Sequence, residues 1–400
     1  MKVLHVITGL GIGGAEQQLR LLLRHLPVQS RVVTLTNPGA VADGIEADGV
    51  PVAHLGMTGN RDVGALPRLT RLIRQGGYDL VHTHLYRACV YGRPAARLAG
   101  VRSVIATEHS LGDVQIEGRP LSAGTRALYL ATERLGTSTV AVSPSVARRL
   151  AAWGVAPARI RVVPNGIETD RFAFDPLARA TTRAALGLPA DAFVVGGVGR
   201  LAAGKRFDRL VRAVASVPEA RLLLVGEGDR RAELLRLAGE CGAADRVLLA
   251  GAVPDPPTGP AGGRPDLPSL LAAMDVFVST SPDETFGLAV VEALAAGLPA
   301  LYVACPAIDD LPAGAAPGAR RIGPSVPELI GALRELLAER DTRGARGSGN
   351  AGGTWDAGNP ARPDRLPPPE AVRRYDIAHS ARQLLTLYHQ AVHGPHLSVK

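Results

Sequence analysis

The chain has 400 residues, of which 46% are hydrophobic and 20% are charged, which excludes a disordered protein and indicates two domains of ordinary size. No uninterrupted apolar run reaches the length of a membrane span, and the first strand candidate lacks the small-residue cleavage site of a signal peptide. Three widely separated cysteines (Cys89, Cys241 and Cys305) lack metal-ligand spacing, so we expect free thiols in a reducing cytoplasm.

The formal net charge of +8 belongs to the first part of the chain. Residues 1–180 hold 21 Lys and Arg against 13 Asp and Glu, whereas residues 181–400 hold 24 of each. Aromatic residues make up only 4%, and no recognition-helix motif accompanies the charge, so nucleic acid is not the expected partner. A basic acceptor-binding domain, or a peripheral contact with an anionic membrane, fits better. A generally arginine-rich composition is the alternative.

Strands and helices alternate along the first half of the chain. Helical spacing of leucines over 15–26 and 66–73 separates short apolar runs, a pattern that predicts a doubly wound parallel sheet. A helix near 65–75 places Arg68, Arg71 and Arg74 near one face. The strand candidates lie at 2–8, 31–36, 51–55, 79–83, 102–107, 138–142 and 160–163.

The alternation restarts in the second half, after a change of domain near 165–190. We therefore predict an α/β protein with two Rossmann-like domains facing a cleft, an N-terminal acceptor domain over 1–180 and a C-terminal donor domain over 181–365. A final helix over about 370–392, within 370–400, should return to the first domain. The second-half strand candidates lie at 192–198, 221–225, 246–250, 275–279 and 299–303.

Two segments stand out by composition. Residues 254–266 are rich in Pro and Gly and predict a flexible insertion before a helix at 267–274. Residues 341–369 are rich in Gly, Pro and Arg and predict a mobile linker.

The stretch Ser281–Pro299 carries the strongest functional signal. It follows the apolar run 273–279, which reads as a buried strand, and it continues as a turn and a helix. A helix start offers unpaired N–H groups and a positive dipole end, which suit a phosphate. Glu284 in the turn and Glu292 in the helix can accept hydrogen bonds from sugar hydroxyls. The alternative is an ordinary amphipathic helix with a solvated glutamate.

Glu284-x-Phe286-Gly287, followed by Glu292, resembles the paired-glutamate motif of the retaining glycosyltransferases of family 4, which have the GT-B fold. Other segments resemble that family in the same order: Gly9–Glu16, Ala106–Ser110, Val142–Ser145 with Val163–Ile167, and Val198–Leu201 with Lys205. The similarity covers about residues 1–300 and the final helix. The region after Cys305 departs from the family pattern, so contacts made by that loop are in question.

The resemblance implies roles for particular residues. Arg200 and Lys205 would bind the donor diphosphate, beside the N–H groups of Phe286, Gly287 and Leu288. Lys205 is the one lysine away from the two chain ends, in a chain whose other basic residues are arginines apart from Lys2 and Lys400. Glu292 would hold the nucleotide ribose. Glu284 would contact the transferred sugar.

The remaining implied site residues belong to the first domain. Gly13 and Gly14 would let the backbone approach the phosphates, although a Gly-rich loop after a first strand also occurs in Rossmann dehydrogenases. His109 would donate a hydrogen bond near the anomeric carbon. His82 and His84 are weaker candidates, and for His82 a structural role at a strand end is the preferred interpretation.

We therefore expect a cytoplasmic, retaining glycosyltransferase that moves a sugar from a nucleotide-diphosphate sugar, with UDP or GDP as the favoured nucleotide, to a hydroxyl acceptor. No cofactor and no metal are expected, because two cations and a helix start neutralise the diphosphate and no Asp-x-Asp sequence is present. A sugar-nucleotide epimerase and a degenerate partner or activator protein of the same fold are the alternatives.

Overall fold

The structure is a computed structural model that describes residues 1–59, 62–112, 115–117, 119–253, 265–347 and 365–394. The chain divides into two compact units. Unit 1 comprises Met1–Ile167 with Tyr375–Lys400, and unit 2 comprises Glu168–Arg374. Each unit is an α/β domain built on a parallel sheet, which confirms the predicted fold class.

The sheet of unit 1 has the strand order β3-β2-β1-β4-β5-β8-β9 within the described residues, and all its pairings are parallel. The central strands are buried on both faces, as parallel strands covered by helices require. Its strands are β1 (Lys2–Gly9), β2 (Gln29–Asn37), β3 (Val52–His54), β4 (Leu80–His84), β5 (Ser103–Glu108), β8 (Ser138–Ala141) and β9 (Ile160–Val162). The pair β6 (Gln115–Ile116) and β7 (Arg119–Pro120) is antiparallel.

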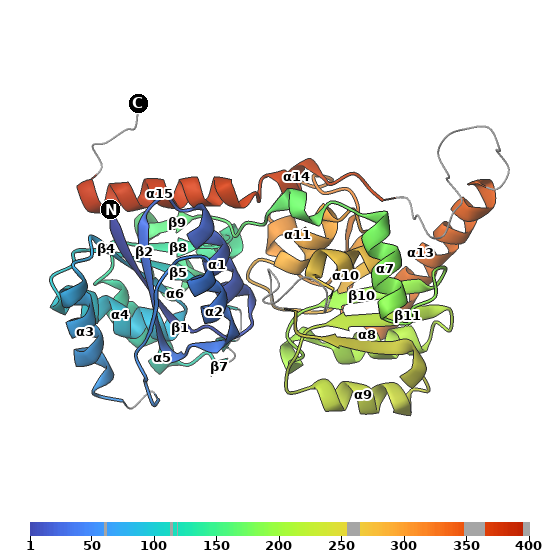
Figure 1. Cartoon of the computed structure of the whole chain (residues 1–400), viewed down its shortest axis with the longest axis horizontal. Helices are drawn as coiled ribbons and strands as arrows, with labels where there is room; N and C mark the ends of the chain where they lie inside the picture. The colour runs from blue at the N-terminus through green and yellow to red at the C-terminus, as the bar shows by residue number, and fades with distance from the viewer. Residues whose placement is uncertain (60–61, 113–114, 118, 254–264, 348–364, 395–400) are drawn as a thin grey trace. The chain divides into compact units, whose positions relative to one another are not determined.

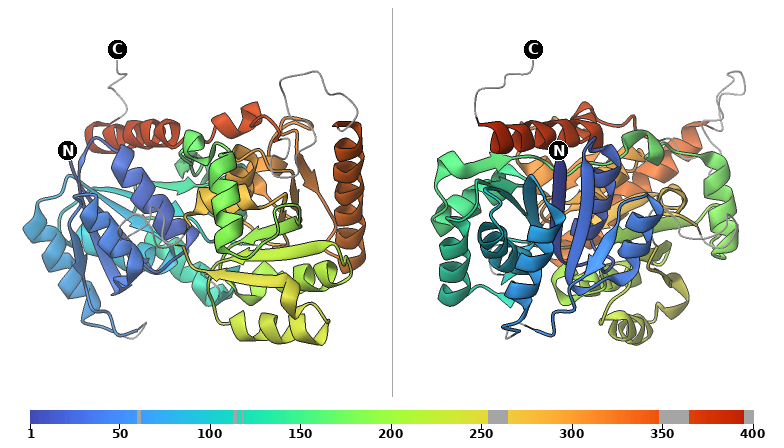
Figure 2. Two further views of the ribbon diagram at one scale, coloured as in Figure 1. Left: turned by 45° about the vertical axis from the view of Figure 1, so that its right-hand side comes forward. Right: turned by 60° about the vertical axis from the view of Figure 1, so that its left-hand side comes forward.

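Helices cover both faces of this sheet. One apolar core joins the sheet to α3 and α4, and two others join its opposite face to α1, α2 and α15. The helix α15 contacts α1 (Figures 1 and 2). The helices of unit 1 are α1 (Gly14–His25), α2 (Gly39–Ala47), α3 (Ala65–Gly76), α4 (Tyr86–Leu98), α5 (Ala123–Glu133), α6 (Pro144–Trp153), the 3-10 turn η1 (Pro157–Arg159) and α15 (Ile377–His393).

Unit 2 repeats the same topology. Its strand order is β12-β11-β10-β13-β14-β15, again with parallel pairings. One face packs on α8, α9 and α13, and the other contacts α11. The strands are β10 (Phe193–Val198), β11 (Ala220–Val225), β12 (Val247–Gly251), β13 (Val276–Ser279), β14 (Ala300–Tyr302) and β15 (Ala319–Arg321).

Two helices of unit 2 begin at a capping aspartate. The Asp175 carboxylate accepts a hydrogen bond from the Leu177 N–H at the start of α7, and Asp266 accepts one from Ser269 at the start of α10. The helices are α7 (Pro176–Ala185), α8 (Phe207–Ala215), α9 (Arg231–Glu240), α10 (Leu267–Ala273), α11 (Leu288–Ala295), α12 (Pro306–Asp309), α13 (Val326–Gly347), α14 (Glu370–Arg373), and the 3-10 turns η2 (Thr169–Phe172), η3 (Ala203–Lys205) and η4 (Ala244–Arg246).

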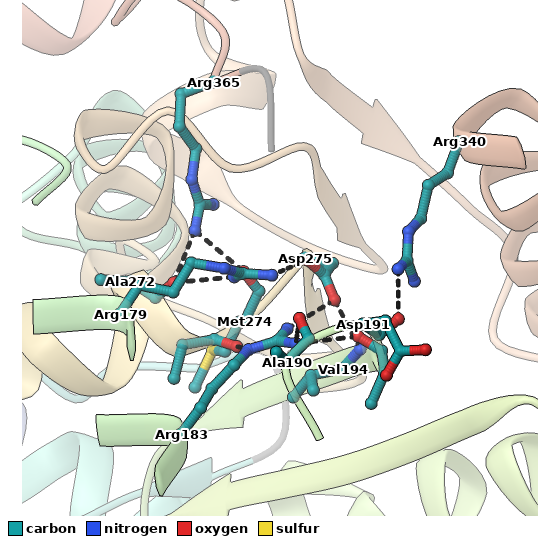
Figure 3. A network of polar contacts seen from close by, with 12 residues as sticks. Arg179, Arg183, Ala190, Asp191, Val194, Ala272, Met274, Asp275, Arg340 and Arg365 are labelled. Carbon is teal, nitrogen blue, oxygen red and sulfur yellow. Dashed lines mark hydrogen bonds and ion pairs between the residues drawn. The ribbon is translucent and has the colours of Figure 1, made fainter. Parts of the chain in front are cut away.

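A buried arginine cluster ties α7 to the end of α10 (Figure 3). The Asp275 carboxylate accepts hydrogen bonds from Arg179 (2.7 Å) and Arg183 (2.8 Å). Arg179 and Arg365 also donate to the carbonyls that end α10, where the helix dipole favours cations. Burial alone raises the pKa of Asp275, but the two arginines outweigh it and hold the pKa below its ordinary value. The cluster thus fixes Arg365 to the end of α10.

Several sequence-based boundaries need revision. The predicted boundary at residue 180 falls inside α7, because unit 2 begins at Glu168. The predicted final helix over 370–392 is two helices, since Asp376 forms a parallel bridge with Ile167, which donates to the Tyr375 carbonyl and accepts from the Ile377 N–H. The predicted linker begins too early, because α13 is helical to Gly347. Most of the predicted insertion over 254–266 and of the predicted linker over 341–369 lies outside the described residues, which lack 254–264 and 348–364.

Within the described part, none of the helices is both long and apolar enough to cross a membrane.

Candidate active site

The predicted site residues follow the central strands of both sheets. In each unit the strand order reverses beside the first strand, at β1 and β4 in unit 1 and at β10 and β13 in unit 2. Ligands of open α/β sheets bind beyond the carboxyl ends of strands at such a switch point. Gly13 follows β1, Arg200 follows β10 and Glu284 follows β13, so these predicted residues lie at the switch points, whereas His109 follows the neighbouring strand β5.

In unit 2, the loop after β10 carries Arg200 and Lys205. Gly199 donates to the Val225 carbonyl and Leu201 donates to the Glu227 carbonyl, each at 2.9 Å, so the neighbouring loop holds this segment. A Cβ at Gly226 would lie 1.9 Å from the Gly199 carbonyl oxygen, so only glycine permits this approach. Arg200 is exposed.

The turn after β13 contacts the same loop. The Thr280 hydroxyl donates to the Lys205 carbonyl at 2.7 Å, and Lys205 Nζ lies 2.5 Å from Glu284 Oε1. The Glu284 side chain is 14% exposed and that of Lys205 34%. The structure thus brings two predicted site residues into one ion pair at the carboxyl edge of the sheet.

The start of α11 is shaped by Gly287. Its φ of 97° is left-handed, and a Cβ there would lie 2.5 Å from Cys305 Sγ. Leu288 is the first residue of the helix, so its N–H is one of the helix-start donors that make no intrahelical bond. Phe286 precedes the cap residue and is buried. Of the three predicted N–H donors, Leu288 therefore belongs to the helix start, whereas Phe286 lies before it.

The segment after Cys305, which departs from the family pattern, supports this turn. Ala307 N–H donates to the Phe286 carbonyl at 2.9 Å, and Cys305 Sγ lies 3.5 Å from the same oxygen. Burial raises the pKa of the Cys305 thiol far above its ordinary value, so it remains a neutral packing group. Contacts from this region to the glutamate turn are therefore present.

Glu292 lies one helical turn beyond Leu288 on α11. Residues four apart share a helix face, and side chains lean toward the N-terminus, so Glu292 belongs to the face above the helix start. Its side chain is partly buried. Glu284 thus lies in the turn after β13, and Glu292 lies in the helix α11 that follows this turn.

In unit 1, the Gly-rich loop follows β1 and leads into α1. Gly13 is the cap residue of α1, with extended backbone at φ −162°, and Gly14 is its first residue and is exposed. The loop therefore ends at a helix start. This is the local geometry in which backbone N–H groups meet an anion.

His109 follows β5 and joins a buried histidine cluster. His109 Nε2 lies 3.3 Å from His84 Nδ1, and His5 Nδ1 lies 3.2 Å from His84 Nε2. His82 is held separately by Tyr388 (2.6 Å) and the Thr107 hydroxyl (2.7 Å), which supports its structural interpretation. One nitrogen from each of His5, His82 and His84 lies within 4.8 Å of the others. Because hydrogen bonds engage five of their six ring nitrogens, we interpret the group as a hydrogen-bond network.

Sequence reasoning missed three features of the site. Glu108 is fully buried beside His109, and burial raises its pKa to about 7 despite hydrogen bonds from Ser110. Gly226 and Gly228 shape the loop that holds Arg200, and a Gly-x-Gly after the strand at 221–225 could have indicated them. His5 joins the histidines only through the pairing of β1 with β4, for which the sequence carries no local signal.

The two units match two family descriptions. Residues 12–171 match Glycosyltransferase Family 4, and residues 178–348 match Glycosyl transferases group 1. The chain belongs to the GT-B glycosyltransferases of family 4. It is 35% identical to a D-inositol 3-phosphate glycosyltransferase of Acidothermus cellulolyticus over 311 residues, which are 70% of this chain and 64% of that relative. The chain thus spans less than two thirds of that relative's length.

Other family members extend the comparison. The UDP-Gal:alpha-D-GlcNAc-diphosphoundecaprenol alpha-1,3-galactosyltransferase of Escherichia coli is 28% identical over 65% of this chain and 66% of its own. The structure of Anabaena HepE in complex with UDP and glucose has a TM-score of 0.77 and 22% identity, covering 96% of this chain and 98% of its own. Sucrose-phosphate synthase from Thermosynechococcus elongatus has a TM-score of 0.71 and 22% identity, covering 98% and 99%. At this identity the structures support the GT-B fold of the family.

Proposed function

We propose that this family 4 protein transfers a sugar from a nucleotide-diphosphate sugar to a hydroxyl acceptor, with retention of anomeric configuration and without a metal ion. The observation that carries the proposal is the ion pair of Lys205 with Glu284 at the start of α11, with Arg200 on the same loop as Lys205. Two cations and a helix start supply positive charge where a diphosphate would leave.

Each partner of the ion pair has a role in the proposed reaction. In the free protein Glu284 neutralises Lys205, and a bound diphosphate would compete for the ammonium through its own oxygens. Glu284 would then accept hydrogen bonds from hydroxyls of the transferred sugar, while Glu292 holds the ribose. His109 would donate a hydrogen bond near the anomeric carbon.

Retention follows if the acceptor attacks on the face from which the diphosphate leaves. The departing phosphate oxygen then accepts the acceptor's proton, and Arg200 and Lys205 stabilise its charge. No side chain is assigned as the nucleophile. We favour a uridine nucleotide, with guanosine as the second choice, because HepE was solved with UDP and the galactosyltransferase is named for UDP-Gal.

The acceptor belongs to unit 1 in this proposal, because the first part of the chain carries the excess positive charge. Glycans, glycolipids and natural-product precursors bearing hydroxyls are the acceptor classes that we propose. The name of the Acidothermus relative, a D-inositol 3-phosphate glycosyltransferase, makes a phosphorylated polyol a sensible first acceptor to assay.

We also propose a peripheral contact with an anionic surface at the inner face of the membrane, which accords with a cytoplasmic enzyme. A surface hollow of about 350 Å³ is lined by Arg31 and by five residues of α3, among them Arg68 and Arg71. Arg68 is 43% exposed and pairs with Asp62 at 2.7 Å. Arg74 instead donates to the Leu98 carbonyl at 2.7 Å, so Arg31 replaces it in the predicted basic face.

The stereochemistry of transfer tests the main proposal. The purified protein is incubated with an α-linked UDP-sugar and an inositol phosphate in the presence of EDTA, and the product anomer is assigned by NMR. An α-linked product is expected. A β-linked product would contradict retention, and activity only after metal is restored would contradict metal independence. Isomerised free donor without any transfer product would favour the epimerase interpretation, and inertness toward a panel of donors and acceptors would favour a partner protein.

A further inference from the structure

A buried carboxylate holds the connection after β5, which carries His109. Glu108 is the last residue of β5, and its Oε1 accepts hydrogen bonds from the Ser110 N–H at 3.0 Å and from the Ser110 hydroxyl at 3.2 Å. His109 is the residue between these two. One side chain therefore joins the backbone on the two sides of His109.

The far side of the same connection is held by other contacts. Leu111 is wholly buried and forms an antiparallel bridge with β6, and Arg149 of α6 donates to the Leu111 carbonyl at 3.1 Å. The bonds from Ser110 to Glu108 link this segment to the strand end. The position of His109 thus depends on contacts that its neighbours make.

The charge of Glu108 needs an explanation, because burial opposes it. The side chain is wholly buried, and Oε2 has no hydrogen-bond partner among the described residues. A glutamine could accept the same two hydrogen bonds through its amide oxygen and would bury no charge. The carboxylate differs because its charged form makes the stronger hydrogen bonds.

The surroundings of Glu108 place its ionisation near neutral pH. Burial raises its pKa to about 7, and repulsion from Glu117, which follows β6, adds to this effect. The hydrogen bonds from Ser110 and the positive charge of Arg93 on α4 act in the opposite direction. Arg93 is itself wholly buried, so its charge is poorly screened by water.

Three other titratable groups near Glu108 keep one protonation state at pH 7. Burial raises the pKa of the Cys89 thiol on α4 to about 11, and it raises the pKa of Tyr129 on α5 far above its ordinary value. Burial lowers the pKa of His109 to about 4. All three groups are therefore neutral where Glu108 changes its charge.

We propose that Glu108 is a positioning residue of the transfer reaction, whose carboxylate holds the connection that carries His109 and holds it more firmly when ionised. This role rests on the proposed function of His109 as a hydrogen-bond donor near the anomeric carbon. Glu108 acts through its neighbours, because its side chain is wholly buried. The hydrogen bonds to Ser110 are independent of the proposed function.

The first test observes the hydrogen bond from Ser110 in the full-length protein. Serine nitrogens are labelled with 15N, and the Ser110 amide is identified by its loss in Ser110→Ala. The signal should shift as Glu108 ionises, with a midpoint at about pH 7, and should not do so in Glu108→Gln. Glu117→Gln should lower the midpoint, because a repelling charge is removed. A Ser110 amide that responds neither to pH nor to Glu108→Gln would overturn the proposal.

The second test measures transfer. Glu108→Leu removes both acceptor oxygens, so kcat should fall at least about tenfold. The affinity for UDP should stay unchanged, because the predicted diphosphate-binding residues Arg200 and Lys205 belong to unit 2. Glu108→Gln keeps an uncharged acceptor and should restore much of kcat. The ratio of the wild-type kcat to that of Glu108→Gln should rise about threefold as the pH passes 7.

Glu46→Leu, an exposed change on α2, is the matched control. Wild-type kcat in folded Glu108→Leu, or a kcat ratio that does not vary with pH, would overturn the positioning role. If Glu108→Leu does not fold, the Ser110 amide and Glu108→Gln decide. An inactive wild-type protein would contradict the proposed function, whereas a Ser110 amide that ignores Glu108 would overturn the positioning role even in an active protein.

Discussion

Lys205 Nζ lies 2.5 Å from Glu284 Oε1, although 79 residues separate them in the chain. The pair joins the loop after β10 to the turn after β13, which are the two connections at the switch point of unit 2. Removal of either partner therefore changes the charge presented to a donor and the contact between the two loops.

Lys205→Ala should lower turnover by about two orders of magnitude, because the departing diphosphate loses a compact positive charge. Steady-state kinetics with a UDP-sugar measure the loss. Arg236→Ala is the control, since Arg236 forms an exposed pair with Glu240 within α9. Near-normal turnover of Lys205→Ala would show that the cation is misassigned.

Glu284→Gln and Glu292→Gln should differ in the step that they impair. Glu292→Gln should weaken binding of free UDP by about 1–3 kcal/mol, since a charged hydrogen bond to the ribose is lost. Glu284→Gln should bind UDP with similar or greater affinity, because Lys205 no longer has a competing carboxylate, but its kcat should fall. Calorimetric titration with UDP distinguishes them. Unchanged affinity in Glu292→Gln would refute the ribose role.

Unit 1 should bind anionic vesicles at low salt through the hollow lined by Arg31, Arg68 and Arg71. Arg31→Glu with Arg71→Glu should abolish the difference between anionic and neutral vesicles in a sedimentation assay. Arg74→Glu should have a smaller effect, because Arg74 is engaged with the Leu98 carbonyl. Equal sedimentation of the wild-type protein with both vesicle types would remove this proposal.

Glu108 should make the stability of unit 1 depend on pH. Its folded-state pKa of about 7 lies above the ordinary value of 4.5, so the unfolded chain releases this proton first as the pH rises. The resulting stabilisation of the folded state is complete below about pH 4.5 and is lost as the pH rises to 7, at a cost of up to about 3 kcal/mol.

Glu108→Gln should therefore be more stable than wild type at pH 8 and close to it at pH 4. Comparing the two proteins by thermal unfolding across this range isolates Glu108 from the buried histidines, which both proteins share. Glu46→Gln, an exposed change on α2, provides the baseline. A difference between wild type and Glu108→Gln that does not vary with pH would contradict the raised pKa.

Asp275→Asn should destabilise unit 2 by about 3–5 kcal/mol, since Arg179 and Arg183 would remain buried with their shared carboxylate removed. Denaturant unfolding measures the change. Glu335→Gln breaks an exposed pair with Arg320 and should alter stability by less than about 1 kcal/mol. Equal effects of the two substitutions would show that the cluster in Figure 3 contributes little.

The sequence predicted most of the fold because parallel strands buried on both faces read as apolar runs. The runs at 2–8, 79–83 and 192–198 became β1, β4 and β10. Local signals failed where a tertiary contact decides the structure. The helical pattern of 370–392 is interrupted because Ile167 exchanges backbone hydrogen bonds with Tyr375 and Ile377.

For the candidate site, the sequence likewise predicted individual residues but not the contacts between them. Lys205 stood out because the chain otherwise uses arginine almost throughout, and Glu284 stood out by its motif. Their mutual distance was not predictable, because it depends on how β10 and β13 pair across 79 residues. The link from His5 to His109 was missed for the same reason, since strand register is not a local property of sequence.

The contact of Tyr388 with His82 affects the order in which the two units can finish folding during synthesis. Tyr388 lies in the core of unit 1, beside strands that are synthesised about 300 residues earlier. All of unit 2 leaves the ribosome before that core can be completed, and domains fold as units during synthesis. The first unit to be synthesised is thus the last to finish folding, because the apolar residues that α15 covers stay uncovered until α15 has been made.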